Sequence, residues 1–270
     1  MEAAALLLLL ALFGRRKTDV QQAVTPGGST FKELAEKTVA SLKETAPPSQ
    51  AALPSPGVNV FATAWKTRTT ALVKRAASGA RWTPMLSKAF GGNAGASTAA
   101  ARWIGIESGG KTSTTTPLGE YGLAQGMKEN YSAADWIAVR DPKTTDEQHA
   151  AIAARLIMRD VKATTRSNKA TPGTLGLGYL YHALPLMVRE LREQGLLKES
   201  VAETLVGTLG PYKASAKVAS YVKGKHAVTS NVNQNIVLRF FAPAAVVAYG
   251  ENAISLLDSL ADAAARAPSA

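Results

Sequence analysis

The chain has 270 residues, and its 31 Lys and Arg against 20 Asp and Glu give a formal net charge of +11, which favours an anionic partner such as nucleic acid, a membrane surface or the acidic cell envelope. It contains no cysteine, which excludes a disulfide framework, a thiolate nucleophile and a Cys-based metal site. Ala, Leu, Lys and Arg are plentiful, aromatic residues are sparse and β-branched runs are short, so we expect a mainly α protein.

The chain begins with an apolar run at residues 3–13, which lies between Glu2 and the basic cluster Arg15-Arg16-Lys17. A secretory signal carries its positive charges before the apolar run, so the order here is inverted. As a helix the run is roughly 16 Å long, well short of a ~30 Å hydrocarbon core, so an ordinary transmembrane span is not expected. A terminal helix docked on the protein itself or on a partner is the prediction, and membrane contact or an unusual export signal is the alternative.

A short helix is predicted at residues 30–45, where Thr30 and Glu33 have the spacing of a capping box. The Pro- and Ser-rich stretch 46–57 cannot continue a helix and is predicted to be a linker. The main domain should therefore begin near Val58.

Residues 58–90 are basic and amphipathic, and four of their apolar side chains are expected in the core: Phe61, Trp65, Leu72 and Val73. No known nucleic-acid motif accompanies the basic residues, so we interpret them as a solvated helix face and do not expect nucleic acid as a partner. Further helices are predicted at residues 97–108, 145–164, 174–194 and 201–209 and in the tail 235–267.

Three parts follow from this pattern. Residues 1–57 form an N-terminal arm with the apolar helix, the short helix and the linker, residues 58–210 form the main domain, and residues 211–270 form a C-terminal helical extension. Arg239 and Pro243 interrupt the apolar part of that extension, which favours packing in a core or against a partner over crossing a membrane.

One carboxylate, Glu107, ends an otherwise apolar predicted helix, with Trp103 and Ile106 close to it and Gly109-Gly110 as a left-handed stop. Apolar walls and the negative end of the helix dipole disfavour the ionised form, and no Lys or Arg follows within three residues, so we expect Glu107 to hold its proton unusually well. General-acid cleavage of a glycosidic bond requires such a group. A surface Glu just beyond a helix end is the alternative that these observations leave open.

The residues after Glu107 add a longer pattern. Glu107-Ser108 is followed by residues 116–125 (TPLGEYGLAQ), then by Asp141-Pro142 before a predicted helix, and then by Leu180-Tyr181-His182-Ala183. This order resembles the soluble lytic transglycosylases, in which E-S is followed by P-x-G-x-x-G-L-M-Q, by a D-P stretch and by A-Y-N-A. Four ordered matches over about 80 residues are far more specific than one motif.

The resemblance implies a lysozyme-like α domain whose long cleft binds alternating N-acetylglucosamine and N-acetylmuramic acid. It implies that Glu107 first protonates the glycosidic oxygen and then, as a carboxylate, takes the proton of the muramoyl C6 hydroxyl, which closes a 1,6-anhydro ring without water. Carried over by position, Glu107 is the catalytic acid/base and Ser108 orients it or the sugar. Gly122 and Leu123 belong to the loop that passes the glycan, and Gln125 and Tyr181 are expected to line the cleft and to bond Glu107 or the substrate.

Three residues depart from the family pattern: Ala124 replaces Met, Gly126 replaces an aliphatic residue and His182 replaces Asn. Glu120 offers a second carboxylate that could position a water, as in goose-type lysozymes, so a muramidase that uses Glu107 with Glu120 is the alternative reaction. His149, His182 and His226 lack ligand spacing, and we expect neither a metal site nor a cofactor.

A wall-cutting enzyme with no standard export signal, a basic surface and apolar terminal helices is typical of a bacteriophage particle that degrades the cell wall from outside during genome ejection. We therefore expect a virion protein that acts in the periplasm and cell envelope, with peptidoglycan strands as substrate and virion or envelope-complex proteins bound through the terminal helices. A bacterial secretion machine is the alternative setting, and an inactive glycan-binding structural protein is the alternative from another functional class.

Overall fold

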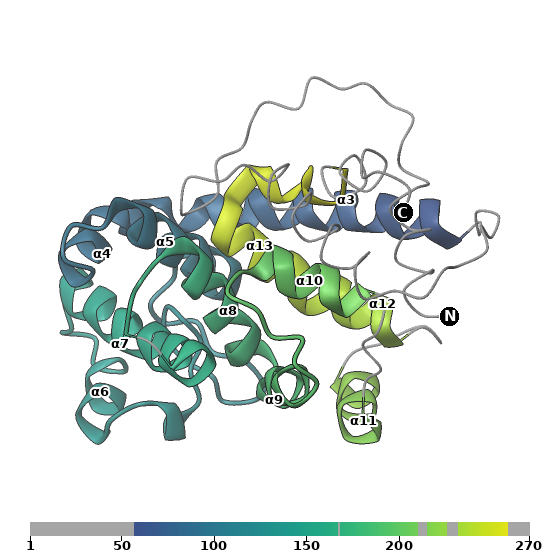
Figure 1. Cartoon of the computed structure of the whole chain (residues 1–270). Helices are drawn as coiled ribbons and strands as arrows, with labels where there is room; N and C mark the ends of the chain where they lie inside the picture. Colours follow the sequence, from purple (N-terminus) through teal and green to yellow (C-terminus); the bar gives the residue numbers. More distant parts are fainter. Residues whose placement is uncertain (1–56, 167, 210–214, 226–231, 259–270) are drawn as a thin grey trace, which may run out of the picture. The chain divides into compact units, whose positions relative to one another are not determined.

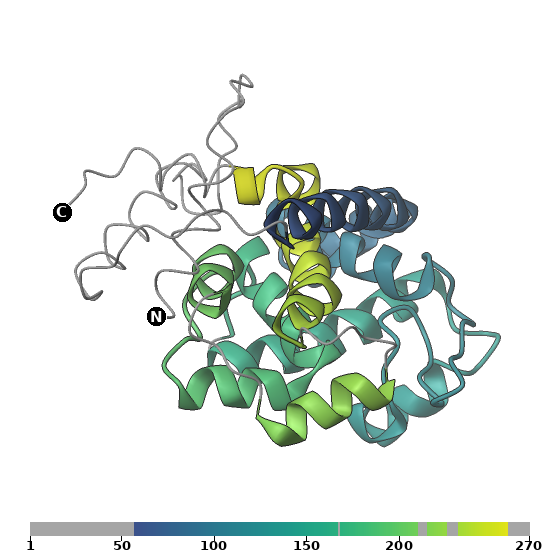
Figure 2. The same cartoon turned by 90° about the vertical axis from the view of Figure 1, so that its right-hand side faces the viewer.

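The computed structural model of the protein describes residues 57–166, 168–209, 215–225 and 232–258. Within these residues the structure is mainly α, which confirms the predicted class (Figure 1 and Figure 2). The only extended pairings described are two isolated bridges, Thr115 with Tyr121 and Tyr121 with Gly126. The predictions for residues 3–13, 30–45 and 46–56 fall outside the described part of the chain.

The described residues divide into two compact units. The central unit consists of residues 71–183 and 243–250, and the flanking unit contains the described parts of residues 57–70, 184–242 and 251–258. The central unit includes the end of α3 (Gly57–Ala76), most of α13 (Ala242–Tyr249), and η1 (Ala77–Trp82), α4 (Thr83–Ala89), α5 (Ala94–Ser108), η2 (Lys128–Asn130), α6 (Ala133–Ala138), α7 (Asp146–Thr165) and α8 (Pro172–Ala183). Its helix α5 packs against η1, α4 and α8, and α7 packs against α8 and α4.

Helix α5 is the central helix of this unit, and its ends are set by local hydrogen bonds. The side chain of Asn93 accepts from the backbone N–H of Ala96 and caps the first turn. Gly109, with φ +64°, ends the helix in the left-handed conformation, and Gly110 follows with φ +76°, so the predicted glycine stop is confirmed. Small and apolar side chains make most of α5 buried, which places Glu107 at the edge of the core.

Two glycines allow the backbone of α5 to touch the preceding segment directly. A Cβ on Gly105 would lie 2.3 Å from the carbonyl oxygen of Ala76, and one on Gly79 would lie 1.8 Å from the carbonyl oxygen of Ala101. Real Cβ atoms do not approach oxygens this closely, so any side chain at either position forces the segments apart. The position of Glu107 therefore depends on this close crossing.

Helix α7 begins with a capping box, which was not among the predicted features. The Thr145 side chain accepts from the backbone N–H of Gln148, and the Gln148 side chain accepts from the backbone N–H of Thr145. Helix α7 also contacts α8 closely. A Cβ on Gly178 of α8 would lie only 2.8 Å from Cγ2 of Val161 on α7, so only glycine fits there. Helices α7 and α8 are therefore tightly packed on each other, and α8 packs against α5.

The flanking unit contains α9 (Pro185–Glu193), α10 (Val201–Leu209), α11 (Ala216–Lys225), α12 (Val232–Ile236), the π-helical turn η3 (Val237–Phe241) and, apart from Gly250, η4 (Gly250–Ala253). The indole N–H of Trp65 donates to the Ala253 carbonyl at 3.1 Å, and Nε of Arg68 donates to the Leu238 carbonyl at 2.7 Å. None of the described helices combines the length and the apolar character that crossing a bilayer requires.

Several predicted helices are confirmed, and three details differ. The helix predicted at 201–209 is α10, and those at 97–108 and 145–164 are α5 and α7 with slightly different ends. The helix predicted at 174–194 is two helices, because Pro185 removes an N–H and disfavours a helical backbone at Leu184, whose φ is −155°. Helix α6 was not predicted, and α11 lies in the extension 211–270 that was predicted to be helical. Of the four expected core residues, Phe61, Trp65 and Leu72 are buried, whereas Val73 is half-buried.

The variant Gly105→Ala should destabilise the protein by at least about 3 kcal/mol, because the added methyl group meets a backbone carbonyl that no side-chain rotation can move. Gly173→Ala is the matched control in α8, since a Cβ there meets nothing nearer than 3.9 Å and the residue does not have a positive φ. Chemical denaturation followed by circular dichroism measures the free energy of unfolding of both variants. Equal stability of the two variants would contradict the close crossing.

Candidate functional site

Glu107 lies in the last turn of α5 and is half-buried. The hydroxyl of Tyr179, on α8, donates a hydrogen bond to its Oε1 atom. Glu107 therefore does not extend freely into solvent beyond the helix end, which was the alternative left open by the sequence.

Two arginines reach the end of α5 from earlier segments. Nη2 of Arg75 donates to the backbone carbonyl of Glu107 at 3.0 Å, and Nη2 of Arg81 donates to the carbonyl of Gly110 at 3.0 Å. The indole N–H of Trp82 donates to the same Gly110 carbonyl at 3.0 Å. These cations offset the negative end of the helix dipole. No Lys or Arg follows Glu107 within three residues, as the sequence analysis noted, but Arg75 and Arg81 come to this helix end through the fold, which local sequence does not predict.

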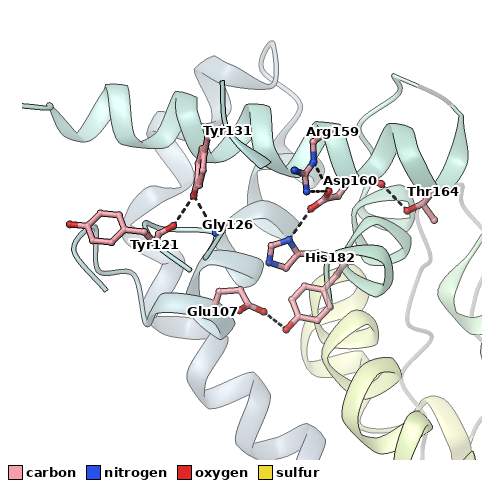
Figure 3. A network of polar contacts seen from close by, with 9 residues as sticks. Glu107, Tyr121, Gly126, Tyr131, Arg159, Asp160, Thr164 and His182 are labelled. Carbon is pink, nitrogen blue, oxygen red and sulfur yellow. Dashed lines mark hydrogen bonds and ion pairs between the residues drawn. The ribbon is translucent and has the colours of Figure 1, made fainter. Parts of the chain in front are cut away.

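A second polar network lies beside Glu107 in the same unit and is centred on Asp160 of α7, whose side chain is fully buried. Oδ1 of Asp160 accepts from Nε of Arg159 at 2.9 Å and also from its Nη2. Oδ2 lies 2.8 Å from Nδ1 of His182 on α8. In Figure 3 the ring of His182 lies between the Asp160 carboxylate and the side chain of Glu107.

The environment of His182 favours its protonated form. Burial by itself lowers the pKa of this imidazole, but the hydrogen bond and charge of Asp160, with further contributions from the charges of Glu107 and Glu120, outweigh it. The pKa of His182 therefore lies above its ordinary value. Both carboxylates that the sequence singled out thus act electrostatically on this ring.

Trp103 holds the two networks together. Its ring, which is fully buried, lies edge-on to the rings of Tyr179 and His182, with centroid distances of 5.1 Å and 5.2 Å. Trp103 and Glu107 are one turn apart on α5, and Tyr179 and His182 are three residues apart on α8, so each pair shares a helix face. Glu107, Tyr179 and His182 come together where these faces meet. With Asp160 of α7, which binds His182, they form what we call the Glu107 cluster.

The hydroxyl that bonds Glu107 comes from Tyr179 and not from Tyr181, which was the expected residue. Two residues along an α-helix turn the side chain by about 200°, so Tyr179 and Tyr181 face opposite sides of α8. A glycan contact of Tyr181, which is half-buried, stays a prediction.

Gln125 holds the loop of residues 112–126 together from inside. Its Nε2 donates to the carbonyls of Thr114, at 3.0 Å, and Gly122, which fixes the orientation of the amide because both partners are acceptors. Its backbone φ is +49°, and its buried Oε1 has no hydrogen-bond partner in the described residues. Gln125 was expected to bond Glu107 or the substrate. Among the described contacts it supports the loop and makes no bond to Glu107, and a substrate contact stays a prediction.

The base of this loop is fastened by Tyr131. The hydroxyl of Tyr131 donates to the carbonyl of Tyr121 at 2.7 Å and accepts from the N–H of Gly126 at 3.2 Å (Figure 3). Burial raises the pKa of Tyr131 to about 12, although the hydrogen bond from Gly126 acts in the opposite direction. The phenol thus stays protonated and can serve as both donor and acceptor.

The other predicted site residues lie on α5 or in this loop. The hydroxyl of Ser108 donates to the Ile104 carbonyl at 3.1 Å and so bonds its own helix. Leu123 is buried. Gly122 has φ +82°, and a Cβ there would lie 2.7 Å from Cγ2 of Val139, so this glycine is required by the loop itself. Oε2 of Glu120 accepts from the Thr116 hydroxyl at 2.9 Å.

Sequence reasoning missed Tyr179, Asp160 and Arg159. Asp160 had a detectable signal, because it occupies a core position of the amphipathic pattern of α7, where a carboxylate is rarely buried without a specific partner. In the described part of the chain, no group of three or more His, Asp and Glu side chains is placed to hold a metal ion.

Comparisons of the chain with protein-family models, with curated proteins and with solved structures found no significant match. The case for a function therefore comes from the motif order in the sequence and from the contacts of the Glu107 cluster.

The isosteric variant Gln125→Glu should loosen the loop, because an acceptor-only carboxylate would face two carbonyl oxygens. An unsatisfied buried group costs about 1–3 kcal/mol, so amide hydrogen exchange in residues 112–126 should accelerate by at least about fivefold. Glu120→Gln is the matched control, since an amide oxygen can still accept from Thr116. Unchanged exchange in Gln125→Glu would show that the amide does not hold the loop.

Proposed function

We propose that this protein is a peptidoglycan lytic transglycosylase, which cleaves the β-1,4 bond between N-acetylmuramic acid and N-acetylglucosamine and leaves a 1,6-anhydro end. The observation that carries the proposal is a half-buried carboxylate, bonded by a tyrosine hydroxyl, at the start of the motif that resembles the lytic transglycosylase signature. The mainly α structure agrees with the lysozyme-like domain that this resemblance implies, and the lysozyme-like fold is itself part of the proposal.

The contacts of Glu107 suit the two steps of this reaction. In the first step Glu107 gives its proton to the glycosidic oxygen, and the bond from that oxygen to C1 of the muramic acid breaks. In the second step the carboxylate takes the proton of the C6 hydroxyl while O6 bonds to C1, so Glu107 regains its proton and no water is consumed. Tyr179 engages Oε1 and leaves Oε2, which no described residue bonds, to carry the proton.

The decisive variant is Glu107→Gln, which keeps the size of the side chain but cannot donate or take the proton. We expect its murein-cleaving rate to fall by at least about 10²-fold, with loss of the clearing zone in a murein gel. Glu129→Gln, which changes an exposed carboxylate in η2, is the matched control and should retain full activity. Mass spectrometry of the products should show 1,6-anhydro ends in the parent protein.

Two other functions predict different results in this experiment. A muramidase that uses Glu107 with Glu120 is the second candidate, because Glu120 lies close enough to act on His182 and is held by Thr116. Its products would carry reducing ends, and Glu120→Gln would abolish activity, whereas a transglycosylase keeps most of its activity in that variant. An inactive glycan-binding protein would give no clearing zone even in the parent protein.

The variant Tyr179→Phe should lower kcat by about 10- to 100-fold, because it removes a hydrogen bond to a charged group while the contact of the ring with Trp103 remains. Tyr181→Phe, on the other side of α8, should change KM if the predicted glycan contact exists and should leave kcat unchanged. Steady-state kinetics on soluble glycan strands separate the two. Equal kcat values for Tyr179→Phe and the parent would contradict the role given to this hydroxyl.

The setting that we propose is a bacteriophage virion that carries the enzyme to the cell envelope for local wall penetration and genome ejection. The basic net charge of +11 suits an acidic envelope. Detection of the intact chain in purified virions would support this setting, and a chain processed in the bacterial periplasm would contradict it.

A further inference from the structure

A second titratable side chain, His182, lies beside the carboxylate of the proposed reaction. Only 8 % of the His182 side chain is exposed, and its Nδ1 atom is bound to the fully buried Asp160. Because Nδ1 is engaged, the ring orientation is fixed and Nε2 is the nitrogen left for another role.

Asp160 does not need His182 for charge neutralisation. Arg159 already supplies two N–H donors to Oδ1 of Asp160, which compensates the buried charge. The other oxygen, Oδ2, is the one that holds the imidazole. The arrangement therefore orients a histidine, which is more than the burial of Asp160 requires.

We propose that Asp160 and His182 are positioning residues of the Glu107 site: Asp160 fixes the ring of His182, and the protonated ring is the charge partner of the Glu107 carboxylate. This inference rests on the proposed function, because the carboxylate form of Glu107 is the one produced when it gives its proton to the glycosidic oxygen. An adjacent positive charge favours proton donation and then keeps the carboxylate in place until the C6 hydroxyl gives up its proton.

The groups around His182 support this assignment from each neighbouring element. Asp160 and Arg159 face it from α7, Glu107 from α5, Glu120 from the loop, and Tyr179 lies one turn away on α8, with a ring-centroid distance of 6.4 Å. Three carboxylates against one guanidinium favour a proton on the ring. The electrostatic attraction between two groups acts equally on both. The carboxylate of Glu107 favours the protonated ring of His182, and the protonated ring therefore favours the carboxylate.

This reciprocity can be measured without any catalytic turnover. The chain has only three histidines, so an NMR titration of the imidazole signals can be assigned by replacing each in turn. In the parent protein His182 should titrate at higher pH than His149, whose pKa is lowered by burial despite the nearby charge of Asp146. Glu107→Gln should lower the His182 midpoint, and Asp160→Asn should lower it further, because each variant removes a negative charge that acts on the ring. Glu129→Gln should leave it unchanged.

The second readout is the pH dependence of kcat/KM in His182→Asn. The Asn amide can still donate to Asp160 from nearly the position of Nδ1, but it carries no charge, so the variant removes the charge and keeps the hydrogen bond. The parent protein loses the charge of the ring when His182 deprotonates, whereas the variant has no such charge to lose. The alkaline limb of the profile should therefore move to higher pH, and kcat should fall by about tenfold or more. His149→Asn, the control, should leave the limb in place.

An unchanged His182 midpoint in Glu107→Gln would overturn the proposal, as would an unchanged alkaline limb in an active, folded His182→Asn protein. If His182→Asn does not fold, the titrations of the parent and Glu107→Gln proteins still decide. Failure of the proposed function gives a different result. In that case Glu107→Gln still lowers the His182 midpoint, but the parent protein releases no muropeptides.

Discussion

The packing of α5 against α8 is the constraint on which the rest of this site depends. It brings the Trp103–Glu107 face of one helix against the Tyr179–His182 face of the other, and the fully buried Trp103 ring contacts both aromatic partners. The close backbone crossing at Gly79 and Gly105 fixes α5 against the end of α3 and η1. Protein interiors are packed densely enough that these contacts leave Glu107 few alternative positions.

The site combines charges that cannot be buried separately. Asp160 is fully buried, Arg159 compensates its charge, and its other oxygen holds His182, while Arg75 and Arg81 bind the carbonyls at the end of α5. The contact with Arg159 offsets the cost of burying the charge of Asp160, whereas Arg75 and Arg81 are themselves exposed. In the function we propose, the same arrangement allows one carboxylate to give up a proton and then take one back, because a cation and a hydroxyl are already in place beside it.

The sequence predicted what depends on local pattern: the mainly α class, the glycine stop after Glu107 and the burial of Trp65 and Leu72. It did not predict what depends on which helix faces meet. Tyr181 was chosen from a motif, but the rotation of α8 presents Tyr179 to Glu107. Likewise, Arg75 is distant from Glu107 in sequence and reaches its carbonyl only through the fold. The side chain of Gln125 points into its own loop because Thr114 and Gly122 offer carbonyls there.

The central claim is that Glu107 performs both proton transfers and that no water enters the reaction. Digestion of murein by the parent protein in ¹⁸O-labelled water tests this claim most directly, with the released fragments analysed by mass spectrometry. The account predicts muramic acid ends that lack one molecule of water and carry no ¹⁸O. Reducing muramic acid ends that contain ¹⁸O would contradict it.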